Sequence, residues 1–220
     1  MANQLDLQEQ EQLDELKAFW KQWGNLITWV LTAVLLAFAG WNGWNWYRRD
    51  QAVKASGLFE ALDRAAQEGD VQKTGRAFDD LKDRYPRTEF AGQGGLLAAK
   101  LQFEKGQADR ARANLQWVAD NASDDDYRSL ARLRLSGLML EAKQYDEALK
   151  QLDAAKSAAF AALVADRRGD ILLAQGKRDE AKAAYTTAYK GMDERMSYRQ
   201  LVDAKLMALG AAPAASGAKP

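Results

Sequence analysis

Residues 130–156 read LARLRLSGLMLEAKQYDEALKQLDAAK. Apolar residues recur every three to four positions on both sides of Lys143, a spacing that is typical of two amphipathic helices joined by a turn. Such a helical pair cannot bury its apolar face alone. Further pairs are therefore expected to stack against it along the chain.

The turn at Lys143 has counterparts at Gly69, Gly106 and Gly176, and the four turns are separated by 37, 37 and 33 residues. A small or apolar residue stands five, nine and twelve positions beyond each turn, and these offsets share one helix face. The period is close to the roughly 34 residues of tetratricopeptide repeats. The sequence therefore predicts an all-α fold, a tetratricopeptide-like solenoid of helical hairpins, with an irregular helical bundle as the alternative.

The turns also give the ranges of the expected helices. They are 51–67 with 71–84, 89–105 with 108–119, 126–142 with 146–156, 160–175 with 179–190, and a terminal helix over 196–209. Residues 210–220 are rich in Ala, Gly and Pro, and this tail is predicted to be disordered.

Residues 26–46 read LITWVLTAVLLAFAGWNGWNW and contain no charged residue. A helix of about 20 residues crosses the hydrocarbon core of a bilayer, so the run is long enough to span it. Six of the seven tryptophans lie between Trp20 and Trp46, toward the two ends of the run, as in the aromatic belts of a membrane helix. The sequence predicts an N-terminal arm over 1–23 and a transmembrane helix over 24–47.

Three other structures compete with a membrane anchor for this run. A buried core helix would seldom carry tryptophan at both ends and none between. A cleaved signal peptide would use Ala37-Phe38-Ala39 as its cleavage signal, but it would begin with a short positive region, whereas residues 6–15 are rich in acids. An amphipathic helix in the membrane interface would need a charged face, which residues 26–40 lack.

One face of the predicted membrane helix is formed by small residues followed by a tryptophan, namely Ala33, Ala37, Gly40 and Trp44. Small side chains let another membrane helix approach closely, so this face is a candidate helix-packing surface that would also allow a homo-oligomer. The alternative is that Ala and Gly are simply frequent in membrane helices.

The composition excludes several classes of chemistry. Without histidine or cysteine the chain cannot form a Ser-His-Asp or Cys-His nucleophile, a disulfide or a His-ligated zinc site. Its 31 basic and 31 acidic residues balance, which argues against binding of nucleic acid. The glycine-rich segment 91–95 lacks the Lys-Ser/Thr of a phosphate loop and is better explained by a weakened helix start or by close packing. No enzymatic activity, cofactor or metal is expected.

Three segments carry a resemblance to a known family: LDELKAFWKQWGN before the apolar run, the block at 130–156, and FAALVADRRGDILLAQGKRDEAKAAYTTA at 160–188. Through them residues 10–209 resemble the YfgM family of ancillary SecYEG translocon subunits. The resemblance implies a bacterial inner-membrane protein with a cytoplasmic N-terminus and a periplasmic repeat domain over 48–209. It also implies association with SecYEG and with a PpiD-like periplasmic chaperone, and it brings no catalytic residues.

The charges around the apolar run do not give this orientation by themselves. Lys17 and Lys21 precede the run, whereas Arg48, Arg49 and Lys54 follow it, which slightly favours the opposite arrangement under the positive-inside rule. Large domains cross the membrane largely regardless of charge, so the orientation implied by the resemblance is retained.

Partner binding is expected on the first helix of each pair, which lines the concave side of such a solenoid. The residues predicted to contact a partner are Phe59, Leu96, Lys100, Phe103, Leu133, Leu140, Asp166 and Asp170. The alternative is that these are core positions and that the register is displaced by one residue. The predicted function is a non-enzymatic subunit that links translocon exit to periplasmic chaperones, with a membrane-anchored scaffold for another envelope assembly as the alternative.

Overall fold

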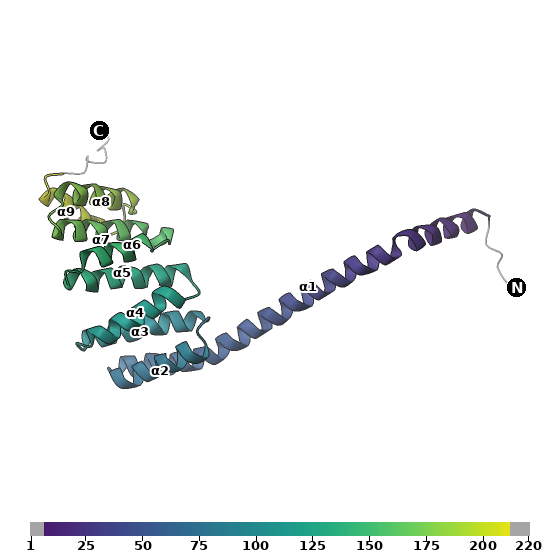
Figure 1. Ribbon diagram of the computed structural model, residues 1–220, viewed down its shortest axis with the longest axis horizontal. Helices are drawn as coiled ribbons and strands as arrows, with labels where there is room; N and C mark the ends of the chain where they lie inside the picture. The colour runs from purple at the N-terminus through teal and green to yellow at the C-terminus, as the bar shows by residue number, and fades with distance from the viewer. Residues whose placement is uncertain (1–6, 212–220) are drawn as a thin grey trace. The chain divides into compact units, whose positions relative to one another are not determined.

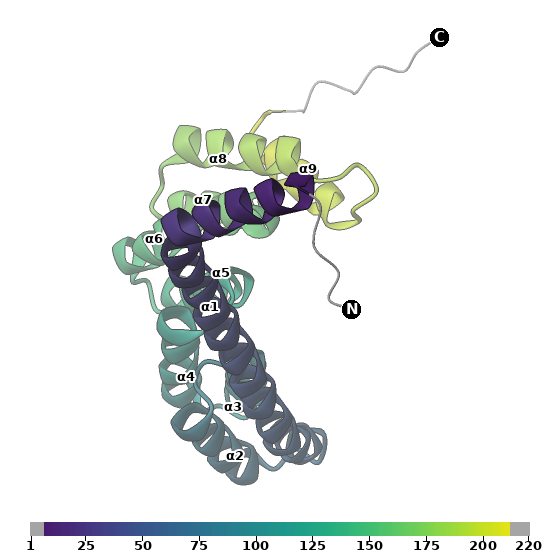
Figure 2. The ribbon, with the colours of Figure 1, turned by 90° about the vertical axis from the view of Figure 1, so that its right-hand side faces the viewer.

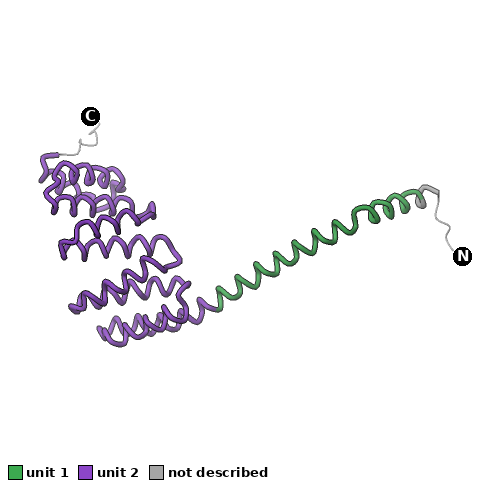
Figure 3. Tube along the Cα trace, viewed as in Figure 1, with its two compact units in different colours: residues 1–50 green, residues 51–220 purple. Residues whose placement is uncertain are grey.

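The computed structural model describes residues 7–211, so most of the tail predicted to be disordered lies outside the described residues. The chain divides into two compact units, Met1–Asp50 and Gln51–Pro220 (Figure 3). The first unit contains the predicted membrane helix, and the second contains the predicted repeats.

α1 (Leu7–Gln67) is a single helix of 61 residues. It is the one helix among the described residues that is long and apolar enough to cross a membrane, with a mean hydropathy of 1.6 in its most apolar window. Only 6% of that window is buried within the structure, so its apolar side chains are not the core of a folded domain. The Thr28 hydroxyl donates to the Gly24 carbonyl at 2.8 Å. This bond gives the hydroxyl a hydrogen-bond partner that lipid chains cannot provide.

The second unit is a stack of helical hairpins (Figures 1 and 2). The last part of α1 precedes α2 (Val71–Arg84), and the following helices are α3 (Glu89–Glu104), α4 (Ala108–Asn121), α5 (Asp125–Glu141), α6 (Tyr145–Asp153), α7 (Ala161–Ala174), α8 (Arg178–Gly191) and α9 (Tyr198–Ala208), with the short 3₁₀ helix η1 (Ala158–Phe160) before α7. The predicted fold class, an all-α tetratricopeptide-like solenoid after a long apolar helix, is confirmed.

All four predicted turns adopt the left-handed backbone conformation. The φ angles are 70° at Gly69, 76° at Gly106, 58° at Lys143 and 79° at Gly176. After each turn a backbone N–H reaches back to the preceding helix, as when Gln144 N donates to Met139 O at 2.8 Å. This hydrogen bond is characteristic of the Schellman motif, in which N–H groups beyond the end of a helix donate to its last carbonyl groups. The chain then turns and enters the next helix.

Lys143 is the one residue other than glycine at these turns, and its side chain makes the left-handed conformation unfavourable. We expect Lys143→Gly to raise the free energy of unfolding by about 1 kcal/mol. The matched change is Gly106→Ala, which should lower the free energy of unfolding by about 1 kcal/mol. Apart from its neighbours in the chain, no atom of residues 7–211 lies within 4 Å of the added methyl group, so only the backbone is affected. Urea titrations of the full chain in detergent, followed by circular dichroism, measure both. We expect the free energy of unfolding to shift by equal amounts in opposite directions. If it stays unchanged in either variant, the explanation is contradicted.

The residues at the repeated offsets form the core between hairpins. Phe78, Leu115, Leu152 and Tyr185, nine residues after their turns, are all at most 3% exposed. Ala155, at the last offset of the third pair, is only partly buried because α6 ends earlier than predicted, at Asp153.

The first helices of successive pairs lie closer together than the second helices do. α3 contacts α5 and α5 contacts α7, whereas α2 with α4, α4 with α6 and α6 with α8 have at most marginal contact within residues 7–211. A stack in which only one set of helices touches must curve toward that set. The first helices therefore line the inner side of the solenoid, as expected, and the second helices line the outer side.

Candidate interaction surface

An apolar row runs along the inner side at the position three residues before each turn. We define the inner row as Phe103 of α3, Leu140 of α5 and Leu173 of α7. Phe103 is 44% exposed and Leu173 is 37% exposed, so both apolar side chains are accessible to solvent. Leu140 is partly buried against the cluster formed by Ala148, Leu152 and Ile171. The inner row therefore combines two exposed apolar side chains with a partly buried one.

The predicted contact residues divide between this exposed row and the core. Lys100 is exposed and lies 3.8 Å from Glu104, so it stands in solvent beside Phe103 on α3. Leu96 is only 7% exposed, and its burial favours the alternative in which it is a core position. The remaining apolar members are intermediate: Phe59 stacks on Phe90 with ring centroids 5.6 Å apart, and Leu133 packs beside Leu140 against the α6 and α7 cluster.

The two predicted acids at the C-terminal end contact α9 of the same chain. Lys205 Nζ lies 2.8 Å from Asp166 Oδ1 and 2.7 Å from Asp170 Oδ1. The Tyr198 hydroxyl donates to Asp166 Oδ2 at 2.8 Å, and the Tyr185 hydroxyl donates to Asp170 Oδ1 at 2.8 Å. Asp166 is 2% exposed, so its charge is stabilised almost entirely by these donors. We call these five residues the α9 clamp.

The α9 clamp shifts the ionisation of its tyrosines. Burial, followed by the hydrogen bond to Asp166, raises the pKa of Tyr198 to about 12. Burial and the hydrogen bond to Asp170 also raise the pKa of Tyr185. A raised folded-state pKa means that this stabilisation is complete below about pH 10 and is lost as the pH rises through the folded-state value. Both hydroxyls therefore remain hydrogen-bond donors throughout the physiological range.

The repeat pattern predicts Asp166 and Asp170 on the inner side, but it gives no sign of the helix that covers them. Their partner Lys205 lies 39 and 35 residues further along the chain, beyond the last repeat, where the repeat pattern gives no information. Leu173 was also missed, although its position before Gly176 matches that of Phe103 before Gly106 and could have revealed it.

The described residues contain no group of three or more histidine, cysteine or acidic side chains arranged to hold a metal ion. Their arrangement instead provides curved helical surfaces with exposed apolar and charged side chains. Such a surface binds other proteins by shape and by side-chain contacts.

Comparison with known proteins agrees with this architecture. The model of a tetratricopeptide repeat-like domain family matches residues 17–211. An ancillary SecYEG translocon subunit from Neisseria gonorrhoeae is 32% identical over 207 residues, covering 92% of this chain and 98% of the relative. Proteins of the same name from Escherichia coli and Haemophilus influenzae are 29% and 26% identical, covering 83% and 89% of this chain and 87% and 97% of the relatives.

Both the apolar helix and the hairpin stack fall within these matches. The chain therefore belongs to the ancillary SecYEG translocon subunits, a non-enzymatic family with a tetratricopeptide repeat-like domain.

Proposed function

We propose that this protein binds the SecYEG translocon and passes emerging polypeptides to a PpiD-like periplasmic chaperone. In this proposal residues 1–23 lie in the cytoplasm, residues 24–47 cross the inner membrane, and residues 48–209 lie in the periplasm. The main support for this proposal is the similarity to named translocon subunits over nearly the whole length of both chains. A match confined to the repeats would support only a generic interaction domain.

The inner row is the proposed contact surface for a partner segment. Phe103 and Leu173 offer apolar side chains, while Lys100 offers a positive charge on the same helix as Phe103. Leu140 between them is partly buried, so the surface is shallow, and a single contact of this kind is expected to be weak. Anchoring the domain in the membrane compensates for this weak affinity, because it holds the surface at high effective concentration near any partner in the same membrane.

The small face of the membrane helix is the second proposed contact. Ala33, Ala37 and Gly40 carry little or no side chain. Apart from the backbone of the helix itself, no atom among the described residues lies within 4 Å of the position that a Gly40 methyl group would occupy. A helix of SecYEG or of a second copy of this chain could therefore approach closely at this face, with Trp44 at its end.

Protease accessibility tests the orientation. Spheroplasts that carry the full chain with a tag after Pro220 are treated with protease before and after lysis. We expect the tag to be digested in intact spheroplasts, as for a periplasmic domain. Protection until lysis would place the repeats in the cytoplasm and overturn the chaperone handover.

Co-purification tests the partners. After mild solubilisation, the tagged chain is expected to retain SecY and a prolyl-isomerase-like chaperone. Recovery of cell-wall or division proteins in their place would contradict the proposal and support the scaffold alternative.

Phe103→Asp tests the inner row. Since Phe103 is 44% exposed, we expect the partner to be lost while the melting temperature of the full chain stays within about 2 °C of the parent. Leu201→Asp is the matched control, because Leu201 is similarly exposed at 48% but lies on α9, and partner binding should persist. Unfolding of the Phe103→Asp variant would instead identify Phe103 as a core residue.

A further inference from the structure

A polar notch opens between α2 and α4 on the outer side of the stack. It measures about 310 Å³ and is lined by α2, α4 and one buried residue of α3, Gln102. Gln102 is 2% exposed and accepts a hydrogen bond from Asn114 of α4 at 2.8 Å. A methyl group added at Gly75 would lie 3.6 Å from the Gln102 amide nitrogen. The notch therefore exists because residue 75 has no side chain to fill it.

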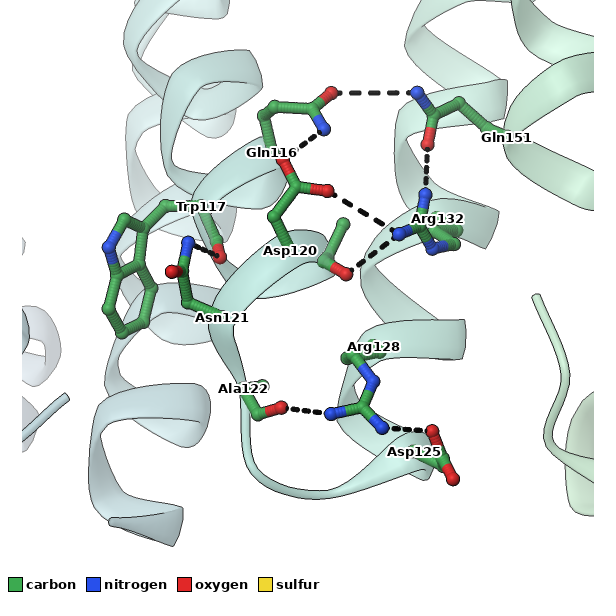
Figure 4. Close-up of polar contacts among 10 residues, drawn as sticks. Gln116, Trp117, Asp120, Asn121, Ala122, Asp125, Arg128, Arg132 and Gln151 are labelled. Atoms are coloured by element: carbon green, nitrogen blue, oxygen red, sulfur yellow. Dashed lines mark hydrogen bonds and ion pairs between the residues drawn. The ribbon is translucent and has the colours of Figure 1, made fainter. Parts of the chain in front are cut away.

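The equivalent space between α4 and α6 is bridged by the chain itself. Arg112, six residues after its turn as Gly75 is after Gly69, extends to Gln144 Oε1 at 3.1 Å. Gln151 Nε2 approaches Gln116 Oε1 at 3.5 Å, a contact that joins α6 to α4 (Figure 4). Side chains of the protein thus satisfy one another in this second space, whereas the notch at α2 and α4 lacks such a bridge within residues 7–211.

Two arginines border the open notch, Arg76 from α2 and Arg110 from α4. In the described part of the chain neither guanidinium forms an ion pair or a hydrogen bond. The acid of the lining, Asp79, is already paired with Lys82 at 2.5 Å, so it does not neutralise the arginines. The two guanidinium groups therefore leave a net positive charge at the mouth of a notch whose floor is made of amides.

We propose that this notch binds a carboxylate-bearing peptide segment of a partner protein. Arginine guanidinium groups recognise carboxylates through paired hydrogen bonds, and side-chain amides can exchange hydrogen bonds with a peptide backbone. The notch lies on the second helices, so this site is separate from the inner row and does not depend on the proposed function.

The test measures binding of a labelled hexaglutamate peptide, acetylated and amidated at its ends, to the full chain in phosphatidylcholine nanodiscs at about 0.15 M salt. We expect fluorescence anisotropy to show binding of hexaglutamate and not of the matched hexaglutamine peptide. Arg76→Gln and Arg110→Gln should each weaken binding by about tenfold. Gly75→Leu should weaken it at least as much, because the new side chain fills the notch without changing the charge.

Arg112→Gln is the matched control, since it removes one positive charge from α4 at a residue that faces α6. It should leave the affinity within about twofold of the parent, and circular dichroism should show the same helicity in all variants. Absence of hexaglutamate binding, an equal loss in Arg112→Gln, or retained binding in Gly75→Leu would overturn the proposal. Loss of peptide binding in nanodiscs with phosphatidylglycerol would overturn it as well, because a lipid phosphate would then be the occupant.

Discussion

Lys205→Met is expected to lower the free energy of unfolding by about 3–5 kcal/mol, more than any other single charge removal described here. The substitution keeps much of the length of the side chain but removes the ammonium group that contacts both acids of the α9 clamp. Asp166 is only 2% exposed, and its carboxylate would then keep the Tyr198 hydroxyl as its one side-chain hydrogen-bond donor among the described residues. A buried charge without its counter-ion is costly, so α9 should separate from α7 before the rest of the stack unfolds.

Urea titration of the full chain in detergent, followed by circular dichroism, measures this effect. The matched control is Lys100→Met, which removes the same charge from an exposed pair 3.8 Å from Glu104 and should change stability by at most about 0.5 kcal/mol. A variant that combines Lys205→Met with Asp166→Asn and Asp170→Asn should regain part of the loss, because no buried charge is left unpaired. Equal losses from the two lysine substitutions would show that the clamp contributes no more than a surface ion pair.

Gly169→Leu is expected to lower the free energy of unfolding by about 3 kcal/mol, by overpacking the interface between α7 and α8. A single methyl group at Gly169 would already lie 2.5 Å from Cδ1 and Cε1 of Tyr185. Tyr185 is 1% exposed and its hydroxyl is held by Asp170, so the ring cannot move aside without breaking the clamp. The higher helix propensity of leucine recovers only about 1 kcal/mol of this loss.

The control for this experiment is Gly57→Leu in α1. Gly57 also lies inside a helix, but in the described part of the chain only the backbone of that helix lies within 4 Å of its added methyl group. We expect this variant to be as stable as the parent or up to about 1 kcal/mol more stable. Differential scanning calorimetry compares the two, and destabilisation of both variants by the same amount would rule out the contact with Tyr185 as the cause.

The helices and turns could be predicted because their signals are local. Glycines at three turns, and the apolar residues at fixed offsets after them, lie within about a dozen residues of one another. The repeat period also predicted the turn at Lys143, although the residue there is not glycine. Of the two explanations for the glycines at residues 91–95, the structure supports close packing, because a methyl group at Gly94 would lie 2.9 Å from Leu81 Cδ1.

The surface could be predicted only in part, because burial depends on residues that are distant in sequence. Phe103, which the repeat register placed on the inner side, is exposed, but the register could not show that α9 would cover Asp166. It also gave no sign of the notch, which depends on Gly75 in one hairpin, Asn114 in the next and a buried amide between them. These features come from contacts between hairpins, which no pattern within one repeat encodes.

The succession of hairpins also allows the domain to fold while it is being synthesised. Each hairpin contacts chiefly the one after it, so its stabilising partners are synthesised within a few tens of residues. Chains with such short-range contacts fold quickly and can begin before synthesis is complete. Folding can therefore follow synthesis from one hairpin to the next, and the contact between Lys205 and Asp166 forms only after α9 has been synthesised.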